Sequence, residues 1–270
     1  MATELRDTQD LQAVELINPQ GQGAAVILCE HASNRFPDDF GDLGLAEADR
    51  QSHAAWDPGA RAVALGLSQA LDAPLVASTV SRLVYDCNRP PHVASAMPSQ
   101  SEKISVPGNR DLDDASRQAR VDRVYLPFRD AVNRLLDARA EAGQPSLLIT
   151  IHSFTPVYND RPRTVEIGIL HDEDAGLADA MLDQAHRLPH RRVERNEPYG
   201  PQDGVTHSLK EYGITRGLPN VMIEIRNDLL TNAADEAQMT DEMLTLLRPA
   251  LDALGAGGSS GAKTGRAQNA

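Results

Sequence analysis

Three short apolar runs constrain the fold of this chain most strongly, because each one ends in polar side chains. Residues 25–28 (AVIL) lead into Glu30 and His31, residues 146–151 (SLLITI) lead into His152, and residues 221–225 contain Glu224 at their end. Runs that are apolar on both faces are typical of strands in parallel sheets, which are covered by helices on both sides. The sequence therefore predicts an α/β fold with these runs as central strands.

The polar residues at the ends of these runs are predicted to meet. In open α/β sheets, ligands bind at the carboxyl ends of the parallel strands. We therefore expect His152 and Glu224 to converge on His31 at one edge of the sheet.

Turn and capping signals place the remaining elements. Asp57 and Pro58 suit the N-cap and first position of a helix that ends near residue 71. Strands or extended segments are expected at 13–18, 75–79, 83–85 and 164–170, a helical turn at 45–52, and helices at 115–141, 175–186 and 233–254. The Ser- and Pro-rich residues 92–110 are expected to form a long surface loop.

The chain is predicted to form one domain over residues 13–254, because no linker interrupts this range. Residues 1–12 are polar, and we expect them to be frayed. The Gly- and Ser-rich tail 255–270 has no apolar pattern and is predicted to be disordered.

Charge and cysteine content narrow the partners and the compartment. A net charge of −13 would repel nucleic acid and anionic membranes, so neither is expected as a partner. A small anionic substrate needs only a local cation and stays compatible with this charge. No run approaches the ~18 apolar residues of a membrane span, and the first residues are too polar for a signal peptide. Cys29 and Cys87 are expected to be buried thiols in strands, which favours the reducing cytoplasm.

His31, His152 and Asp57 are the candidate ligands of a zinc ion. Catalytic zinc sites have three nitrogen, oxygen or sulfur ligands and one open position for water. A helix that returns from the end of a strand begins at that same edge of the sheet, so Asp57 can reach His31. Glu224 is then the candidate base that takes a proton from the bound water. A histidine after a strand is more often a hydrogen-bonded structural residue, and pattern alone leaves both interpretations open.

Arg89 and Asn88 are the candidate substrate-binding residues. The planar guanidinium group of arginine grips a carboxylate with two parallel hydrogen bonds, and an asparagine can donate a further one. The alternative is an Asp86–Arg89 pair that only holds a loop. Arg82 and Arg226 are further cations that are expected to balance charge in the pocket.

Six motifs, in this order along the chain, resemble the N-formylglutamate amidohydrolase family, which is similar in turn to zinc carboxypeptidases and aspartoacylases. They are 30–34 (EHASN), 53–60 (HAAWDPGA), 81–90 (SRLVYDCNRP), 151–156 (IHSFTP), 196–199 (NEPY) and 223–229 (IEIRNDL). The resemblance covers residues 26–254. It implies a mixed sheet flanked by helices and the metal-dependent hydrolysis of an amide on an acidic amino acid.

The resemblance also implies roles for single residues. The segment that contains Asp86, Asn88 and Arg89 would bind a substrate carboxylate, His152 would be a Zn²⁺ ligand and Glu224 the general base. In the mechanism that we expect from these roles, a cation such as Arg226 or the zinc ion itself would hold the oxyanion, and Asn196 and Tyr199 would help Arg89 and Asn88 to fix the carboxylates of the substrate.

One motif departs from the carboxypeptidase pattern His-x-x-Glu, because Asn34 stands at the position of the glutamate. Asparagine is a poor zinc ligand, so the third ligand must come from elsewhere. Asp57 is preferred over Glu30, which precedes His31 and should point to the opposite face of the strand.

The expected substrate is a small anionic N-acyl amino acid, and N-formyl-L-glutamate would yield formate and L-glutamate. Two alternatives remain open. The protein could be a zinc hydrolase of another N-acyl amino acid or of a peptidoglycan-type amide, or it could be a non-catalytic homologue that binds carboxylates.

Overall fold

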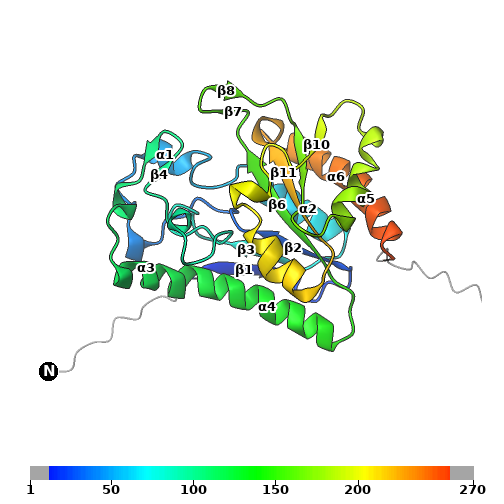
Figure 1. Ribbon diagram of the computed structural model, residues 1–270, viewed down its shortest axis with the longest axis horizontal. Coiled ribbons are helices and arrows are strands. Elements are labelled where there is room, and N and C mark those ends of the chain that lie inside the picture. Colours follow the sequence, from blue (N-terminus) through cyan, green and yellow to red (C-terminus); the bar gives the residue numbers. More distant parts are fainter. Residues whose placement is uncertain (1–11, 256–270) are drawn as a thin grey trace, which may run out of the picture.

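The computed structural model describes residues 12–255, and the predictions for residues 1–11 and 256–270 lie outside the described residues. Within this range the chain forms a seven-stranded sheet with the order β1-β3-β2-β6-β11-β9-β10 (Figure 1). Its strands are β1 (Val14–Ile17), β2 (Ala25–Cys29), β3 (Leu75–Ser78), β6 (Leu147–Phe154), β9 (Ile167–Leu170), β10 (Val193–Arg195) and β11 (Asn220–Arg226). Two small hairpins stand apart from this sheet: β4 (Gln100–Ser101) with β5 (Ile104–Ser105), and β7 (Val157–Tyr158) with β8 (Arg161–Pro162).

The sheet is mixed and mostly parallel, as expected. Strands β3, β2, β6 and β11 run parallel to one another. The edge strand β1 is antiparallel to β3, while β9 is antiparallel to β11 and parallel to β10. The three central strands predicted from the apolar runs, β2, β6 and β11, are therefore direct neighbours whose carboxyl ends lie at one edge of the sheet.

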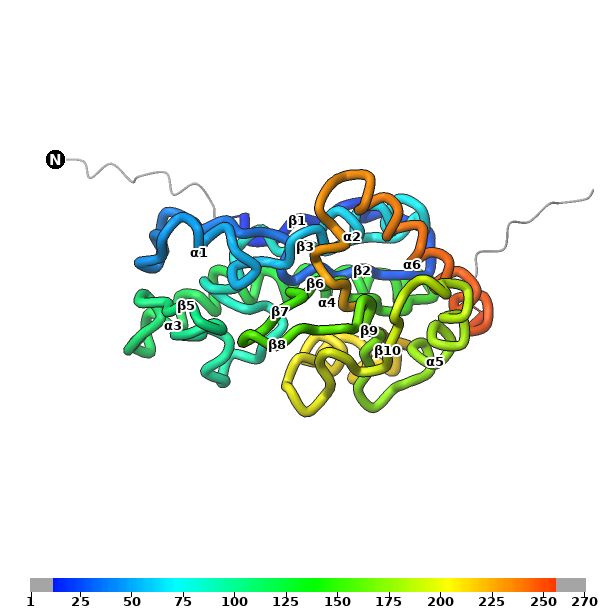
Figure 2. The backbone as a smooth tube through the Cα atoms, turned by 90° about the horizontal axis from the view of Figure 1, so that it is seen from above, coloured from blue at the N-terminus to red at the C-terminus, as the bar shows by residue number. Residues whose placement is uncertain are grey.

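Helices cover both faces of the sheet (Figure 2). The α-helices are α1 (Glu47–Gln51), α2 (Ala60–Ala70), α3 (Asp114–Arg120), α4 (Leu126–Glu141), α5 (Gly176–Leu182) and α6 (Ala233–Ala253). Helices α2, α5 and α6 pack on the face that carries Ile27, Ile149 and Ile223, and α4 packs on the opposite face with Leu28 and Leu148. This double burial explains why the central strands are apolar without alternation.

Most predicted elements are present with shifted ends. The long helix predicted at 115–141 consists of α3, the π-helical turn η4 (Val121–Tyr125) and α4. The helix predicted at 175–186 ends at Leu182, and a separate 3₁₀ turn, η5 (Ala185–Arg187), follows. The loop 92–110 contains the first hairpin and two 3₁₀ turns, η2 (Ala94–Ala96) and η3 (Pro107–Asn109). The further short turns are η1 (Asp38–Phe40), η6 (Pro201–Asp203), η7 (Leu209–Gly213, π-helical), η8 (Ile214–Arg216) and η9 (Asn227–Leu229).

Two local predictions were wrong. Residues 83–85 are not extended: the amides of Val84 and Tyr85 both donate to the carbonyl of Ser81, so the chain turns there, and Cys87 lies in a turn as well. Asp57 does not cap helix α2, because Gly59 occupies the N-cap position with φ +78°. A side chain at Gly59 would meet Leu230 at 2.4 Å, so both the backbone angle and the packing require glycine. The carboxylate of Asp57 is therefore available for other contacts.

Both cysteines are buried free thiols, as expected. Among residues 12–255, the helices are all too short or too polar to cross a bilayer.

Candidate active site

The carboxyl edge of the sheet brings the predicted residues together. His152 on β6 pairs in register with Glu224 on the neighbouring strand β11. His31 follows β2, which is the neighbour of β6 on its other side. All three side chains are almost fully buried, with exposed fractions of 2 to 6%. The convergence predicted from three apolar runs is therefore present in the fold.

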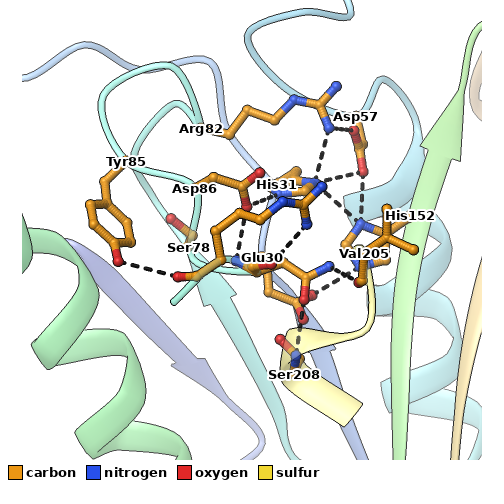
Figure 3. A network of polar contacts seen from close by, with 12 residues as sticks. Glu30, His31, Asp57, Ser78, Arg82, Tyr85, Asp86, His152, Val205 and Ser208 are labelled. Carbon is orange, nitrogen blue, oxygen red and sulfur yellow. Dashed lines mark hydrogen bonds and ion pairs between the residues drawn. The ribbon is translucent and has the colours of Figure 1, made fainter. Parts of the chain in front are cut away.

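Asp57 completes a compact cluster with the two histidines (Figure 3). Its Oδ2 atom lies 3.1 Å from Nδ1 of His31 and 3.0 Å from Nδ1 of His152, and the two Nδ1 atoms are 3.2 Å apart. The amide of Ser153 also points at Oδ2, at 3.3 Å, which helps to hold the carboxylate in place. The three atoms that could bind a metal ion, one from each residue, thus form a nearly equilateral triangle.

The other two candidates for a third ligand lie outside this triangle. Glu30 stands behind His152, with its Oε2 atom 3.3 Å from Nε2 of that imidazole. The carboxamide of Asn34 donates to the side chain of Gln51 at 2.7 Å. The geometry therefore favours Asp57, as the sequence argument did.

The triangle fits a zinc ion. A tetrahedral ion with ligand bonds of ~2.0–2.1 Å keeps its ligand atoms ~3.3 Å apart, close to the spacing of these atoms. Two imidazoles and one carboxylate are also a donor set that zinc accepts. Burial would lower the pKa of both imidazoles, but Asp86 raises the pKa of His31 and Glu30 raises that of His152. The cluster consequently favours a bound positive charge.

Asp86 has a role in addition to the one expected for it. Its Oδ1 atom accepts a hydrogen bond from Nε2 of His31 at 2.7 Å. Burial alone would raise the pKa of Asp86, but the positive charges of His31 and Arg89 hold it below its usual range. Asp86 therefore orients His31; it also lines the cavity, and its expected part in binding a substrate carboxylate stays a prediction.

Glu224 is the carboxyl group best placed for proton transfer. Burial raises the pKa of Glu224 to about 7, against the lowering effect of His152. Within residues 12–255 its Oε2 atom has no hydrogen-bond partner, although it is buried. A carboxyl group with a pKa near neutrality and a free oxygen can both accept and donate a proton at physiological pH.

Arg82 was predicted only to balance charge in the pocket, but it lies in direct contact with the cluster. Its Nη1 atom lies 2.9 Å from Oδ1 of Asp57 and 3.1 Å from Nδ1 of His31. Its Nε and Nη2 atoms donate to the carbonyls of Ala54 and His53, which fixes the plane of the guanidinium group. The predicted charge balance by Arg82 is present, and its position shows that it belongs to the centre of the site. A cation four residues before Asp86 was visible in the sequence, but its direction was not.

These groups line a cavity of about 200 Å³. This volume is below the ~300–1,000 Å³ of sites for drug-sized ligands, so it suits a molecule the size of an amino acid. The remaining wall includes Arg89, Phe154, Tyr158 and Tyr199. Burial raises the pKa of Tyr199 to about 12, so its hydroxyl group stays protonated at neutral pH.

Arg89 and Asn88 both reach the cavity wall. One guanidinium nitrogen of Arg89, Nη1, donates to the carbonyl of Asn88 at 2.8 Å. The carboxamide of Asn88 is strongly engaged elsewhere: it donates to the carbonyl of Val205 at 2.6 Å and accepts from the amide of Ser208 at 3.0 Å. Asn88 therefore anchors the segment 205–208, a structural role that its sequence position did not indicate.

Arg226 and Asn196 are not among the residues that line the cavity, and their expected contacts with the substrate stay predictions. Arg226 pairs with Asp228 at 2.8 Å, and its Nη2 atom lies 3.6 Å from Glu166. The side chain of Asn196 accepts a hydrogen bond from the amide of His171 at 2.9 Å. Both side chains are thus held by neighbours outside the cavity lining.

Two hairpins meet beside the mouth of the cavity. Glu102, in the β4–β5 turn, contacts Nε2 of His53 at 3.0 Å and accepts a hydrogen bond from the amide of Asn159, in the β7–β8 turn. Lys103 and Asp160 form a second bridge between the same two turns. Glu102 and Tyr158, one from each hairpin, line the cavity.

Fold and site together define an α/β enzyme whose active site lies at the carboxyl edge of a mostly parallel sheet. The family model described as N-formylglutamate amidohydrolase matches residues 23–231, and the chain belongs to this family. The protein is thus a hydrolase of the amidohydrolase type, and the resemblance seen in the six motifs is confirmed.

Two solved structures are similar to this chain. A gene product of Agrobacterium tumefaciens is 51% identical, with a TM-score of 0.88, and the match covers 90% of this chain and 96% of that one. An N-formylglutamate amidohydrolase from Ralstonia eutropha is 20% identical, with a TM-score of 0.64 over 88% of this chain and 97% of that one, and it shows the shared fold. Among curated proteins, none matches this chain.

Proposed function

We propose that the protein hydrolyses N-formyl-L-glutamate to formate and L-glutamate with one bound zinc ion. The observation that carries this proposal is the position of Glu224, which lies in the same small cavity as the cluster of His31, Asp57 and His152. Membership of the N-formylglutamate amidohydrolase family supports the reaction type. The metal and the substrate are the proposed parts.

His31, Asp57 and His152 would hold the zinc ion through the three atoms that face one another. When bound there, the ion supplies a Lewis acid, which lowers the pKa of water toward ~7 and polarises the formyl carbonyl group. The other steps belong to side chains of the protein.

Glu224 acts as the base and then as the acid. It takes a proton from the attacking water, whose oxygen adds to the formyl carbon. It then gives this proton to the nitrogen of the leaving amine as the C–N bond breaks. Burial raises the pKa of Glu224 and a zinc ion in the cluster would lower it again, so the carboxylate form is available as the base at neutral pH, and Oε2 has no hydrogen-bond partner within residues 12–255 that would compete for the proton.

Arg82 replaces Arg226 as the cation beside the reacting carbonyl group. Its Nη1 atom is already at the edge of the His–Asp–His cluster, and two backbone carbonyls hold its orientation. A fixed donor of this kind stabilises negative charge on the former carbonyl oxygen. Arg89, farther along the wall, binds a carboxylate of the substrate through the nitrogens that Asn88 leaves free.

The test is a substrate panel with purified protein, with and without added Zn²⁺. N-formyl-L-glutamate, N-acetyl-L-glutamate, N-formyl-L-glutamine and N-formylbutylamine are assayed for the release of a primary amine and of the acid. We expect zinc-dependent formate release that is fastest with N-formyl-L-glutamate. Glu224→Gln is the matched control, because it keeps the shape of the side chain, retains zinc and loses kcat. Turnover that is equal with and without zinc after chelation, or a preference for an uncharged substrate, would reject the proposal.

A further inference from the structure

Glu30 is a buried carboxylate without a role in the proposed reaction. It follows β2, and its exposed fraction is 1%. It lies on the far side of His152 from Asp57, with its Oε2 atom 3.3 Å from Nε2 of the imidazole (Figure 3). A charged group this deeply buried is retained in a folded protein when a partner compensates the loss of water.

These two atoms are each other's available partners. Within residues 12–255, neither Oε2 of Glu30 nor Nε2 of His152 has a hydrogen-bond partner, and their contact at 3.3 Å is an ion pair. Buried polar side-chain atoms are nearly always paired. The hydroxyl group of Ser208 is close enough to this carboxylate to lower its pKa.

The same arrangement occurs at the other histidine. Asp86 contacts Nε2 of His31 at 2.7 Å, while Nδ1 of His31 faces Asp57 at 3.1 Å. Each imidazole of the cluster therefore turns Nδ1 toward Asp57 and Nε2 toward its own carboxylate. A proton on Nε2 of each ring leaves its Nδ1 lone pair free, so the two Nδ1 atoms and Oδ2 of Asp57, which lie 3.0 to 3.2 Å apart, can bind one cation together.

We propose that Glu30 is a positioning residue for the zinc site. It accepts the Nε2 proton of His152 and so holds the imidazole in the tautomer and orientation that present Nδ1 to the ion. The inference depends on the zinc ion of the proposed function. A carboxylate behind a metal-binding histidine orients the ring and strengthens the ligand, and its loss weakens metal binding about 10- to 100-fold.

The segment 205–208 lies near both histidine–carboxylate pairs. Asn88 holds this segment through Val205 and Ser208, and Asp86, which contacts His31, lies two residues before Asn88 in the chain. Residues 86–88 thus support His31 directly and hold Ser208 near Glu30.

The first measurement is the zinc affinity of the whole protein, by competition with a chromogenic chelator. Glu30→Gln keeps the size of the side chain and removes its charge, and we expect its zinc dissociation constant to rise about 10- to 100-fold. Thr150→Val is the matched control, because Thr150 is fully buried on β6, two residues before His152, and its hydroxyl has no hydrogen-bond partner within residues 12–255. Its zinc affinity is expected to stay within twofold of the wild-type value.

A second measurement detects the tautomer itself. In the zinc-loaded wild-type protein, ¹⁵N NMR of the histidine side chains should show a proton on Nε2 of His152. This proton should resonate further upfield and exchange faster in Glu30→Gln, and it should be unchanged in Thr150→Val. Glu30→Asp, which keeps the charge but withdraws it by one methylene group, should fall between the wild type and Glu30→Gln, and it serves if Glu30→Gln does not fold.

Three results would overturn the inference: an unchanged zinc affinity in both Glu30 variants, equal losses in Glu30→Gln and Thr150→Val, or an unprotonated Nε2 of His152 in the zinc-loaded wild type. A wrong choice of substrate would give a different result from a wrong role for Glu30. A wild-type protein that binds zinc and shows the Glu30 effect, but does not hydrolyse N-formyl-L-glutamate, would reject the substrate and leave the role of Glu30 standing.

Discussion

The raised pKa of Glu224 makes the stability of the metal-free protein depend on pH in a direction that can be tested. Burial raises this pKa from its ordinary value of 4.5 to about 7, so the folded protein binds a proton more tightly than the unfolded chain does. The stabilisation is complete below pH 4.5 and is lost as the pH rises through 7. With 1.36 kcal/mol for each factor of ten, Glu224 should lower the free energy of unfolding by about 2.5 kcal/mol between pH 5 and pH 8.

Glu224→Gln removes this titration and nearly preserves the volume of the side chain. Urea unfolding in the presence of a chelator, at several pH values from 5 to 8, gives the free energy of unfolding of both proteins. We expect the wild type to lose about 2.5 kcal/mol more than Glu224→Gln over this range. A chelator is needed because a bound cation would lower the pKa of the nearby carboxyl group.

The same substitution at a half-exposed strand position, Glu194→Gln, controls for the loss of one carboxylate from an acidic chain. The reasoning is refuted if the pH dependences of the wild type and Glu224→Gln are parallel, with a difference below about 0.5 kcal/mol. A difference of the opposite sign, with the wild type gaining stability toward pH 8, would mean that His152 dominates the environment of Glu224 and lowers its pKa.

Three further predictions concern the site in the presence of zinc. His152→Ala should remove most of the bound zinc and abolish hydrolysis, because one of three ligand atoms is lost. A variant that stays fully active and keeps its zinc in metal analysis would contradict the proposed site. Arg89→Lys keeps the charge but loses the planar pair of hydrogen bonds, so kcat/KM should fall about 10- to 100-fold on N-formyl-L-glutamate and much less on N-formylbutylamine. Equal losses on both substrates would make Arg89 structural. Arg82→Lys cannot bond to two backbone carbonyls and Asp57 at once, so kcat should fall about 100-fold while the zinc content stays the same. A change in KM alone would place Arg82 away from the reacting carbonyl group.

The central sheet was predictable because its signal is local. Strands β2, β6 and β11 are apolar on both faces, and this pattern follows from the helices that cover both faces of a parallel sheet. The carboxyl ends of neighbouring parallel strands lie at one edge, so the meeting of His31, His152 and Glu224 followed from chain direction alone.

The helix start at residue 57 shows where local rules failed. Asp57 and Pro58 match the capping preferences of a helix, but the helix begins at Ala60 after a left-handed glycine. The prediction that Asp57 lies near His31 was still correct, because the chain returns to the same edge of the sheet in either case. Its carboxylate contacts His31, His152 and Arg82 and does not bond to the amides at the start of the helix.

The cations of the site were decided by tertiary structure. Arg226 lies on the same strand as Glu224, yet Asp228 holds it outside the cavity. Arg82 was expected to precede an extended segment, but the turn after Ser81 and the distant carbonyls of His53 and Ala54 aim it at Asp57. The sequence by itself determined which strands lie side by side and which residues end them, because periodicity and chain direction are local properties. Only the tertiary structure decided where each side chain points beyond a strand end, because hydrogen bonds between residues far apart in the chain set that direction.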